Sequence, residues 1–116
     1  MIKGMKPQTI IQGKTYGLRI KFSAEDLLKF NKMWFSCASL DILKEMQFDG
    51  IDTYLLELTW QETQALQPCT TTFNITIQLV GTERKRDLAN GIILTIEKNK
   101  NPVPEEVTSE WLYRWN

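Results

Sequence analysis

Histidine is absent from this chain of 116 residues, and cysteine occurs only twice. Histidine is the commonest general base and metal ligand, so its absence excludes catalytic triads of the usual kind. Cys37 and Cys69 are the only residues that could form a disulfide. Because both lie in or beside apolar stretches, we expect buried or half-buried free thiols with no activating base. We therefore expect no enzymatic activity, no catalytic residues, no cofactor and no metal.

Long apolar runs and an excess of one charge are also missing. No stretch approaches the ~20 apolar residues that a membrane span needs, and residues 1–13 lack the apolar core of a signal peptide. Lysine and arginine number 14, as do aspartate and glutamate, and the two signs balance in each half of the chain. This balance argues against a nucleic-acid partner. We expect synthesis in the cytoplasm, without a secretory signal and without a membrane partner.

The length is that of one domain. A chain of this size buries roughly two-thirds of its unfolded surface, which is enough for a core without disulfides. Asn99, Asn101, Pro102 and Pro104 interrupt the pattern of strands near the end of the chain. We therefore expect a single β domain over residues 1–98, followed by a linker and an aromatic C-terminal tail over residues 99–116.

Alternation of apolar and polar residues predicts a mainly β fold. It is clearest over residues 16–22, 54–58, 73–79 and 92–97. Residues 33–39 predict a further strand, with Phe35 and Cys37 facing the core, and residues 9–11 a short one. Residues 40–48 fit one face of a helix as well as a short strand, and Asp49 with Gly50 predicts a turn.

Two short helical turns interrupt the strands. Ser23 followed by Asp26 indicates the first, and Thr59 with Glu62 forms the pattern of a capping box for the second. The charged residues 81–87 predict a solvated connection between two strands. Asn90 and Gly91 suit a bulge or turn just before the last strand.

Three constellations have both a chemical and a structural interpretation. The adjacent carboxylates at residues 25–26 and 105–106 do not face one another across a substrate, so we expect solvated turns. The basic residues 84–86 could bind an anion, but the flanking acids favour a soluble hairpin tip. Residues 74–76 match a glycosylation acceptor within an expected strand, where the match has no consequence.

The end of the chain is unusually aromatic. Trp111, Leu112, Tyr113 and Trp115 lie close together, where chain ends are usually polar. Either Trp111 and Trp115 form one face of a terminal helical turn that packs on its own domain, or the segment docks onto a neighbouring subunit. We retain these four residues, with Trp34, as candidate interface residues.

These patterns in sequence order resemble the small β-sandwich domains of tailed-phage and prophage structural proteins. The resemblance is closest to the amino-terminal domains of siphophage baseplate and tail-fibre proteins. It covers residues 10–98 and includes the helical-turn motif Leu-Thr-x-x-Glu-Thr-x-x-Leu at Leu58 to Leu66. The chain departs from the family pattern where Cys69 and three threonines precede Phe73. The segments that carry the resemblance are residues 13–16, 26–28, 34–36, 58–66, 73–79 and 88–96.

The resemblance implies an antiparallel immunoglobulin-like β-sandwich with one or two short helical turns. It further implies a non-enzymatic structural or assembly protein, associated with the virion after synthesis, whose partners are other particle subunits or copies of itself. The alternative is a sandwich module that binds a small ligand or carbohydrate. Trp34, Trp60 or the terminal aromatics would then serve as stacking platforms.

Overall fold

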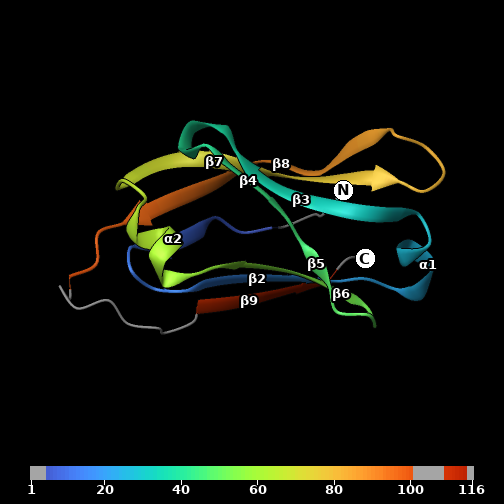
Figure 1. Ribbon diagram of the computed structural model, residues 1–116, viewed down its shortest axis with the longest axis horizontal. Helices are drawn as coiled ribbons and strands as arrows, with labels where there is room; N and C mark the ends of the chain where they lie inside the picture. Colours follow the sequence, from blue (N-terminus) through green and yellow to red (C-terminus); the bar gives the residue numbers. More distant parts are fainter. Residues whose placement is uncertain (1–4, 101–108, 115–116) are drawn as a thin grey trace.

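The computed structural model describes residues 5–100 and the backbone of residues 109–114 (Figure 1). The protein is mainly β, as the alternating pattern predicts. The strands are β1 (Gln8–Ile11), β2 (Tyr16–Lys21), β3 (Phe30–Cys37), β4 (Ile42–Glu45), β5 (Gln47–Phe48), β6 (Thr53–Leu58), β7 (Cys69–Leu79), β8 (Lys85–Glu97) and β9 (Ser109–Arg114). The helices are α1 (Ala24–Leu27), α2 (Trp60–Gln64) and the 3-10 turn η1 (Ala38–Leu40).

The strands form two sheets that lie one above the other in Figure 1. The five-stranded sheet has the order β1-β8-β7-β3-β4, and the four-stranded sheet has the order β5-β6-β2-β9. Most neighbouring pairs are antiparallel, but β1 pairs with β8 and β2 pairs with β9 in parallel. The expectation of a purely antiparallel arrangement is therefore wrong for these two pairs. Parallel pairing needs a long connection between the two strands, and the elements that lie between β1 and β8 and between β2 and β9 in sequence supply it.

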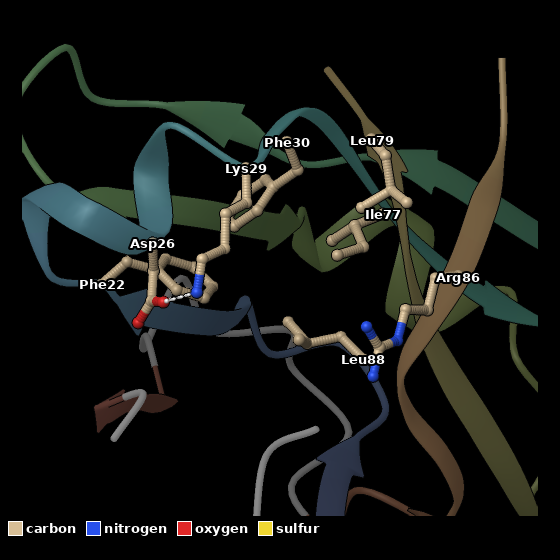
Figure 2. Close-up of a pocket in the computed structure, with 8 residues that line it drawn as sticks. All are labelled: Phe22, Asp26, Lys29, Phe30, Ile77, Leu79, Arg86 and Leu88. Carbon is tan, nitrogen blue, oxygen red and sulfur yellow. Dashed lines mark hydrogen bonds and ion pairs between the residues drawn. The ribbon is translucent and has the colours of Figure 1, made fainter. Parts of the chain in front are cut away.

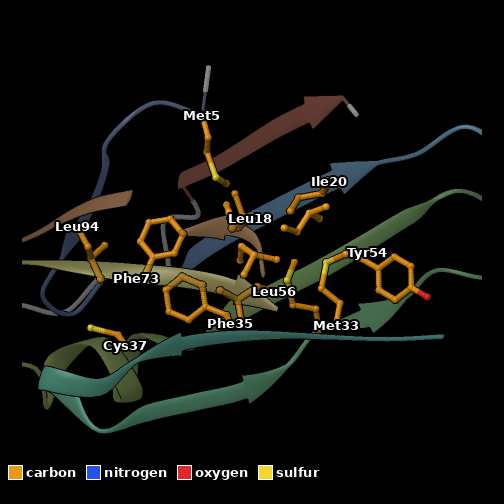
Figure 3. Packing of buried hydrophobic residues seen from close by; sticks show 14 of the residues in the cluster. Met5, Leu18, Ile20, Met33, Phe35, Cys37, Tyr54, Leu56, Phe73 and Leu94 are labelled. Atoms are coloured by element: carbon orange, nitrogen blue, oxygen red, sulfur yellow. The ribbon is translucent and has the colours of Figure 1, made fainter. Parts of the chain in front are cut away.

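One apolar core fills the space between the sheets (Figure 3). The rings of Phe35 and Phe73 stack at its centre, with centroids 4.8 Å apart. Phe35 and Cys37 face this core, as their alternation predicts. Both cysteines are free thiols, with Cys37 buried and Cys69 half-buried, which confirms the expectation from sequence. Other core residues are Ile10, Tyr16, Leu18, Ile20, Met33, Leu56, Leu58, Ile75, Leu94 and Ile96.

The local signals for helix starts are confirmed. The Thr59 side chain accepts from the backbone N–H of Glu62, and the Glu62 carboxylate accepts from the backbone N–H of Thr59. This reciprocal pair satisfies two amides that the short helix α2 leaves without a partner. Ser23 caps α1 in the simpler way, by accepting from the N–H of Asp26. Residues 40–48, left open by the sequence, form strands β4 and β5 after η1.

The β7–β8 pair contains the expected bulge but a shorter connection than expected. One register shift lies at Asn90 and Gly91, opposite Asn74, and Gly91 has a φ of 68°. The Asn74 side chain accepts from the backbone N–H of Gly91 at 2.8 Å, so this asparagine stabilises the bulge. Strand β8 begins at Lys85, so the prediction of a loop through Asp87 is wrong. Lys85 to Asp87 pair with β7 and therefore belong to the strand. Their charge indicates exposure to solvent and gives no sign of this pairing.

The aromatic segment near the end of the chain is a strand. β9 pairs with β2 over six residues, with Leu18 opposite Trp111 and Ile20 opposite Tyr113. The helical-turn interpretation of this segment is therefore wrong, because the backbone is extended and joins the edge of the four-stranded sheet. The side chains of Trp111, Leu112 and Tyr113 lie outside the described residues, as does the whole of Trp115.

The helices are all short. None in the described part of the chain has the length and apolar composition that a membrane-crossing helix requires.

Candidate functional site

Three connections meet at one end of the molecule, on the right in Figure 1. The turn after β2 leads into α1, where the backbone N–H of Phe22 donates to the carbonyl of Asp52 in the β5–β6 turn at 2.9 Å. The backbone N–H of Val80, at the β7–β8 turn, donates to the carbonyl of Lys29 at 3.0 Å. These bonds tie the other two turns to the α1 region. We call this surface the α1 end.

Large apolar side chains are exposed on each of these connections. Leu28 and Ile51 are 78% and 76% exposed, and Val80 and Phe48 are about half exposed. Exposed apolar residues gathered on one surface are typical of an interaction site.

A cluster of aromatic rings lies between the α1 end and the core. Phe22 and Phe30 meet edge to face with centroids 4.9 Å apart, and Phe30 lies 5.4 Å from Tyr54. The Tyr54 ring in turn contacts the half-exposed Phe48 at 5.0 Å. Burial raises the pKa of the Tyr54 hydroxyl, so this residue stays neutral in the physiological range. The cluster connects the exposed surface to the packed core and fixes its shape.

A pocket of about 270 Å³ opens at the α1 end (Figure 2). Its apolar wall consists of Phe22, Phe30, Ile77, Leu79 and Leu88. Three charged side chains complete it. Asp26 and Lys29 form an ion pair at 3.1 Å on one side, and Arg86 lies beside Leu88 on the other.

Arg86 faces the pocket because of the register of β8. It pairs with the buried Ile77, and directly opposite residues in a sheet share one face. Its neighbours Lys85 and Asp87 lie on the outer face. There Lys85 sits over the Trp34 ring at 5.0 Å, and Asp87 accepts from Thr76 at 3.1 Å. One arginine of the basic cluster is thereby separated from the rest and directed to the core side of the sheet.

The β5–β6 turn that presents Ile51 is held by one carboxylate. Asp49 Oδ1 accepts from the backbone N–H groups of Ile51 at 2.8 Å, Asp52 at 3.1 Å and Thr53 at 3.1 Å. These hydrogen bonds, led by that from Ile51, hold the pKa of Asp49 below its usual value of 3.8. Gly50 adopts a φ of 88°, which a turn of this shape requires.

We expect Asp49→Asn to remove a pH-dependent part of the stability. The folded pKa is depressed, so the carboxylate stabilises the fold above the ordinary Asp range, and this contribution is lost as the pH falls through the folded pKa. Urea unfolding should find the wild type more stable than Asp49→Asn at pH 7. The difference should shrink when the pH is lowered from 7 to well below the ordinary Asp value of 3.8, as the carboxylate becomes protonated. A difference that is the same at both pH values would contradict this role.

A second hollow contains charges that are already paired. It lies between β4 and α2 and has a volume of about 320 Å³. Lys44 Nζ donates to Glu62 at 2.8 Å and to the carbonyl of Glu57 at 2.7 Å. Partial burial acts to raise the pKa of Glu62, but hydrogen bonds from Lys44 and Thr59 outweigh it and lower this pKa. These contacts join β4 to the opposite sheet, so we interpret the hollow as structural.

The candidate interface residues from the sequence do not form one surface. Trp34 lies on the outer face of the five-stranded sheet and is half-buried beneath Lys85, in a hollow that also includes Ser36, Leu43 and Thr76. Trp111, Leu112 and Tyr113 belong to β9 in the other sheet, and Trp115 lies outside the described residues. The structure thus assigns Trp34 and β9 to different sheets.

Sequence reasoning did not identify the α1 pocket. Arg86 was noted as part of a basic cluster, but the clue that separates it from Lys85 is its register with β7. The sequence predicts Phe22 as an alternating apolar residue at the end of the strand over residues 16–22, and Phe30 as an apolar position of the helical turn that follows, but not that the two share a pocket. In the described part of the chain, no group of three or more acids and cysteines is arranged to hold a metal ion.

Comparison with known proteins gives no match: no family model fits the chain, and no curated protein or solved structure is significantly similar to it.

Proposed function

We propose that this chain is a non-enzymatic assembly protein of a phage or prophage particle, associated with its baseplate, tail or fibre. The observation that carries the proposal is the α1 end, where Leu28, Phe48, Ile51 and Val80 expose apolar surface over a fixed aromatic cluster. Such a surface gains free energy when a neighbouring subunit covers it. Repeated copies in a particle would raise the effective concentration of every contact.

The particle context rests on the resemblance of residues 10–98 to small sandwich domains of tailed phages. Within this proposal the two sheets correspond to an immunoglobulin-like sandwich, and the protein is virion-associated after synthesis in the cytoplasm. Trp111, Leu112, Tyr113, Trp115 and Trp34 remain proposed contacts to other subunits, in addition to the α1 end.

Mass spectrometry of purified particles tests this function. Particles should be collected from induced cultures of the organism that encodes the chain and separated from free protein by density gradient. We expect peptides of this chain to be present in the particle band in a fixed ratio to the major structural proteins. Peptides confined to the soluble fraction would refute the proposal.

The alternative function is a module that binds a small ligand or carbohydrate. The hollow beside Trp34 favours it, because an aromatic ring flanked by Ser36 and Thr76 offers both stacking and hydrogen bonding. However, Lys85 already covers that ring, and Trp60 lies on α2 rather than on the same face. Sugar binding would favour two aromatic platforms in that hollow, but Trp34 is the one aromatic side chain among its described lining residues. We therefore prefer the assembly function.

A further inference from the structure

The α1 pocket combines an apolar wall with one arginine that has no charged partner. Among the residues that the structure describes, the Arg86 guanidinium makes no ion pair, whereas Lys29 across the pocket is paired with Asp26 at 3.1 Å. The three charged groups of the pocket leave a net charge of one positive unit. An anion that enters the pocket would neutralise this net positive charge.

The charges of the pocket favour a ligand that carries one negative charge next to an apolar group. A guanidinium binds a carboxylate through two parallel hydrogen bonds, which gives direction as well as attraction. The net charge of one positive unit balances one carboxylate, whereas a doubly charged phosphate would leave an uncompensated negative charge in a partly apolar pocket. The apolar wall formed by Phe22, Phe30 and Leu88 favours an aromatic or branched aliphatic group beside that carboxylate.

The surroundings of the pocket indicate that the carboxylate belongs to a protein. At about 270 Å³ the pocket is smaller than the ~300–1,000 Å³ of typical small-molecule sites, and it suits one large side chain. The exposed residues Leu28 and Val80 are next in sequence to the lining residues Lys29 and Leu79, and the Val80 N–H donates to the Lys29 carbonyl. A small ligand in the pocket would leave both exposed, whereas a docked chain would cover them.

We infer that the α1 pocket receives an apolar anchor side chain of a partner subunit, with an adjacent aspartate or glutamate of that subunit paired to Arg86. This inference rests on the proposed function, because it specifies the partner chemistry of the same surface. It predicts that binding depends on both the anchor and the carboxylate, and that added salt weakens it.

A peptide titration followed by NMR tests the inference on the full isotope-labelled chain. The probe is acetyl-Ser-Asp-Phe-Ser-amide, which carries one anchor and one carboxylate. We expect a Kd on the order of 1 mM for so short a segment. Amide shifts should be confined to the pocket residues Lys29, Leu79, Arg86 and Leu88 and to the neighbouring exposed residues Leu28 and Val80. Replacing Asp by Asn, or Phe by Ala, in the peptide should weaken binding at least about fivefold.

Two arginine variants supply a matched comparison. Arg86→Gln should weaken binding of the Asp-Phe peptide at least about fivefold and leave the weaker Asn-Phe peptide unchanged. Arg84→Gln removes the same charge from the exposed β7–β8 turn, outside the pocket lining, and should bind like the wild type. Equal weakening by both variants would mean that only general electrostatic attraction acts, which would overturn the inference.

Phenylpropionate, a small carboxylate with the same aromatic group as the peptide, tests whether the pocket binds a small molecule or a protein segment. If it binds as tightly as the peptide and the peptide produces no shifts at Leu28 and Val80, the pocket takes small molecules and the partner assignment is wrong. If no peptide binds while the chain is present in particles, the pocket inference fails and the assembly function stands. If the peptide binds but particles lack the chain, the assembly function fails instead.

Discussion

Phe35→Ala is expected to lower the free energy of unfolding by about 4 kcal/mol, within the range found when a buried phenylalanine is truncated. Phe35 is fully buried and stacks on Phe73 at 4.8 Å, between the five-stranded and the four-stranded sheet. Its removal leaves a cavity at the point where the two sheets meet. A domain of this size has a total stability of about 5–15 kcal/mol, so the variant would be close to unfolding at physiological temperature.

Urea denaturation measures this loss, and Phe48→Ala is the matched control. Phe48 is 45% exposed and contacts only the edge of the aromatic cluster, so its truncation should cost about 1 kcal/mol. The slope of the unfolding transition should stay the same for both variants, since the folded state remains compact. A loss below about 1.5 kcal/mol for Phe35→Ala would show that the sheets do not enclose this ring.

Truncation after Lys100 is expected to destabilise the protein by about 3 kcal/mol. β9 pairs with all six residues of β2, and its loss would expose the backbone edge of β2 to water. Each hydrogen bond of such a ladder contributes about 0.5–1.5 kcal/mol, from which the cost of ordering the segment is subtracted. The buried side chains of β2, Leu18 and Ile20 among them, would then lie on an edge strand.

The same urea experiment, combined with hydrogen exchange on the full chain, checks this second effect. Backbone amides of residues 109–114 should be protected from exchange, and the truncated chain should unfold at a lower urea concentration. Equal midpoints for the two chains, together with unprotected amides in this segment, would mean that β9 does not contribute to the fold.

Much of the secondary structure is predictable because its signals are local. Thr59 and Glu62 are three residues apart and cap α2 through their own backbone groups, so their pattern determines the structure directly. The alternation of residues 16–22 likewise predicts β2, because one face of a strand must be buried. The Asn90-Gly91 pair indicated its bulge because glycine tolerates the positive φ found there.

The parts that escaped prediction depend on pairing between distant residues. No feature of residues 109–114 identifies β2 as their partner, and the parallel register brings together segments separated by most of the chain. Arg86 could not be assigned to the pocket for the same reason. Its orientation follows from its pairing with Ile77, which is fixed by the bulges between β7 and β8.

Incorporation of surface variants into particles tests the central claim most directly. The double variant Leu28→Ser with Ile51→Ser changes two side chains that are more than three-quarters exposed, so its stability should remain within about 0.5 kcal/mol of the wild type. Ile93→Ser is the control, because Ile93 is 48% exposed but lies on β8 opposite Thr72, outside the α1 pocket and the hollow beside Trp34. Each version is expressed in a host strain that lacks the native copy.

We predict that the double variant falls at least about tenfold in its amount per purified particle, while Ile93→Ser matches the wild type. Equal incorporation of all three chains would contradict the assignment of the α1 end as the docking surface.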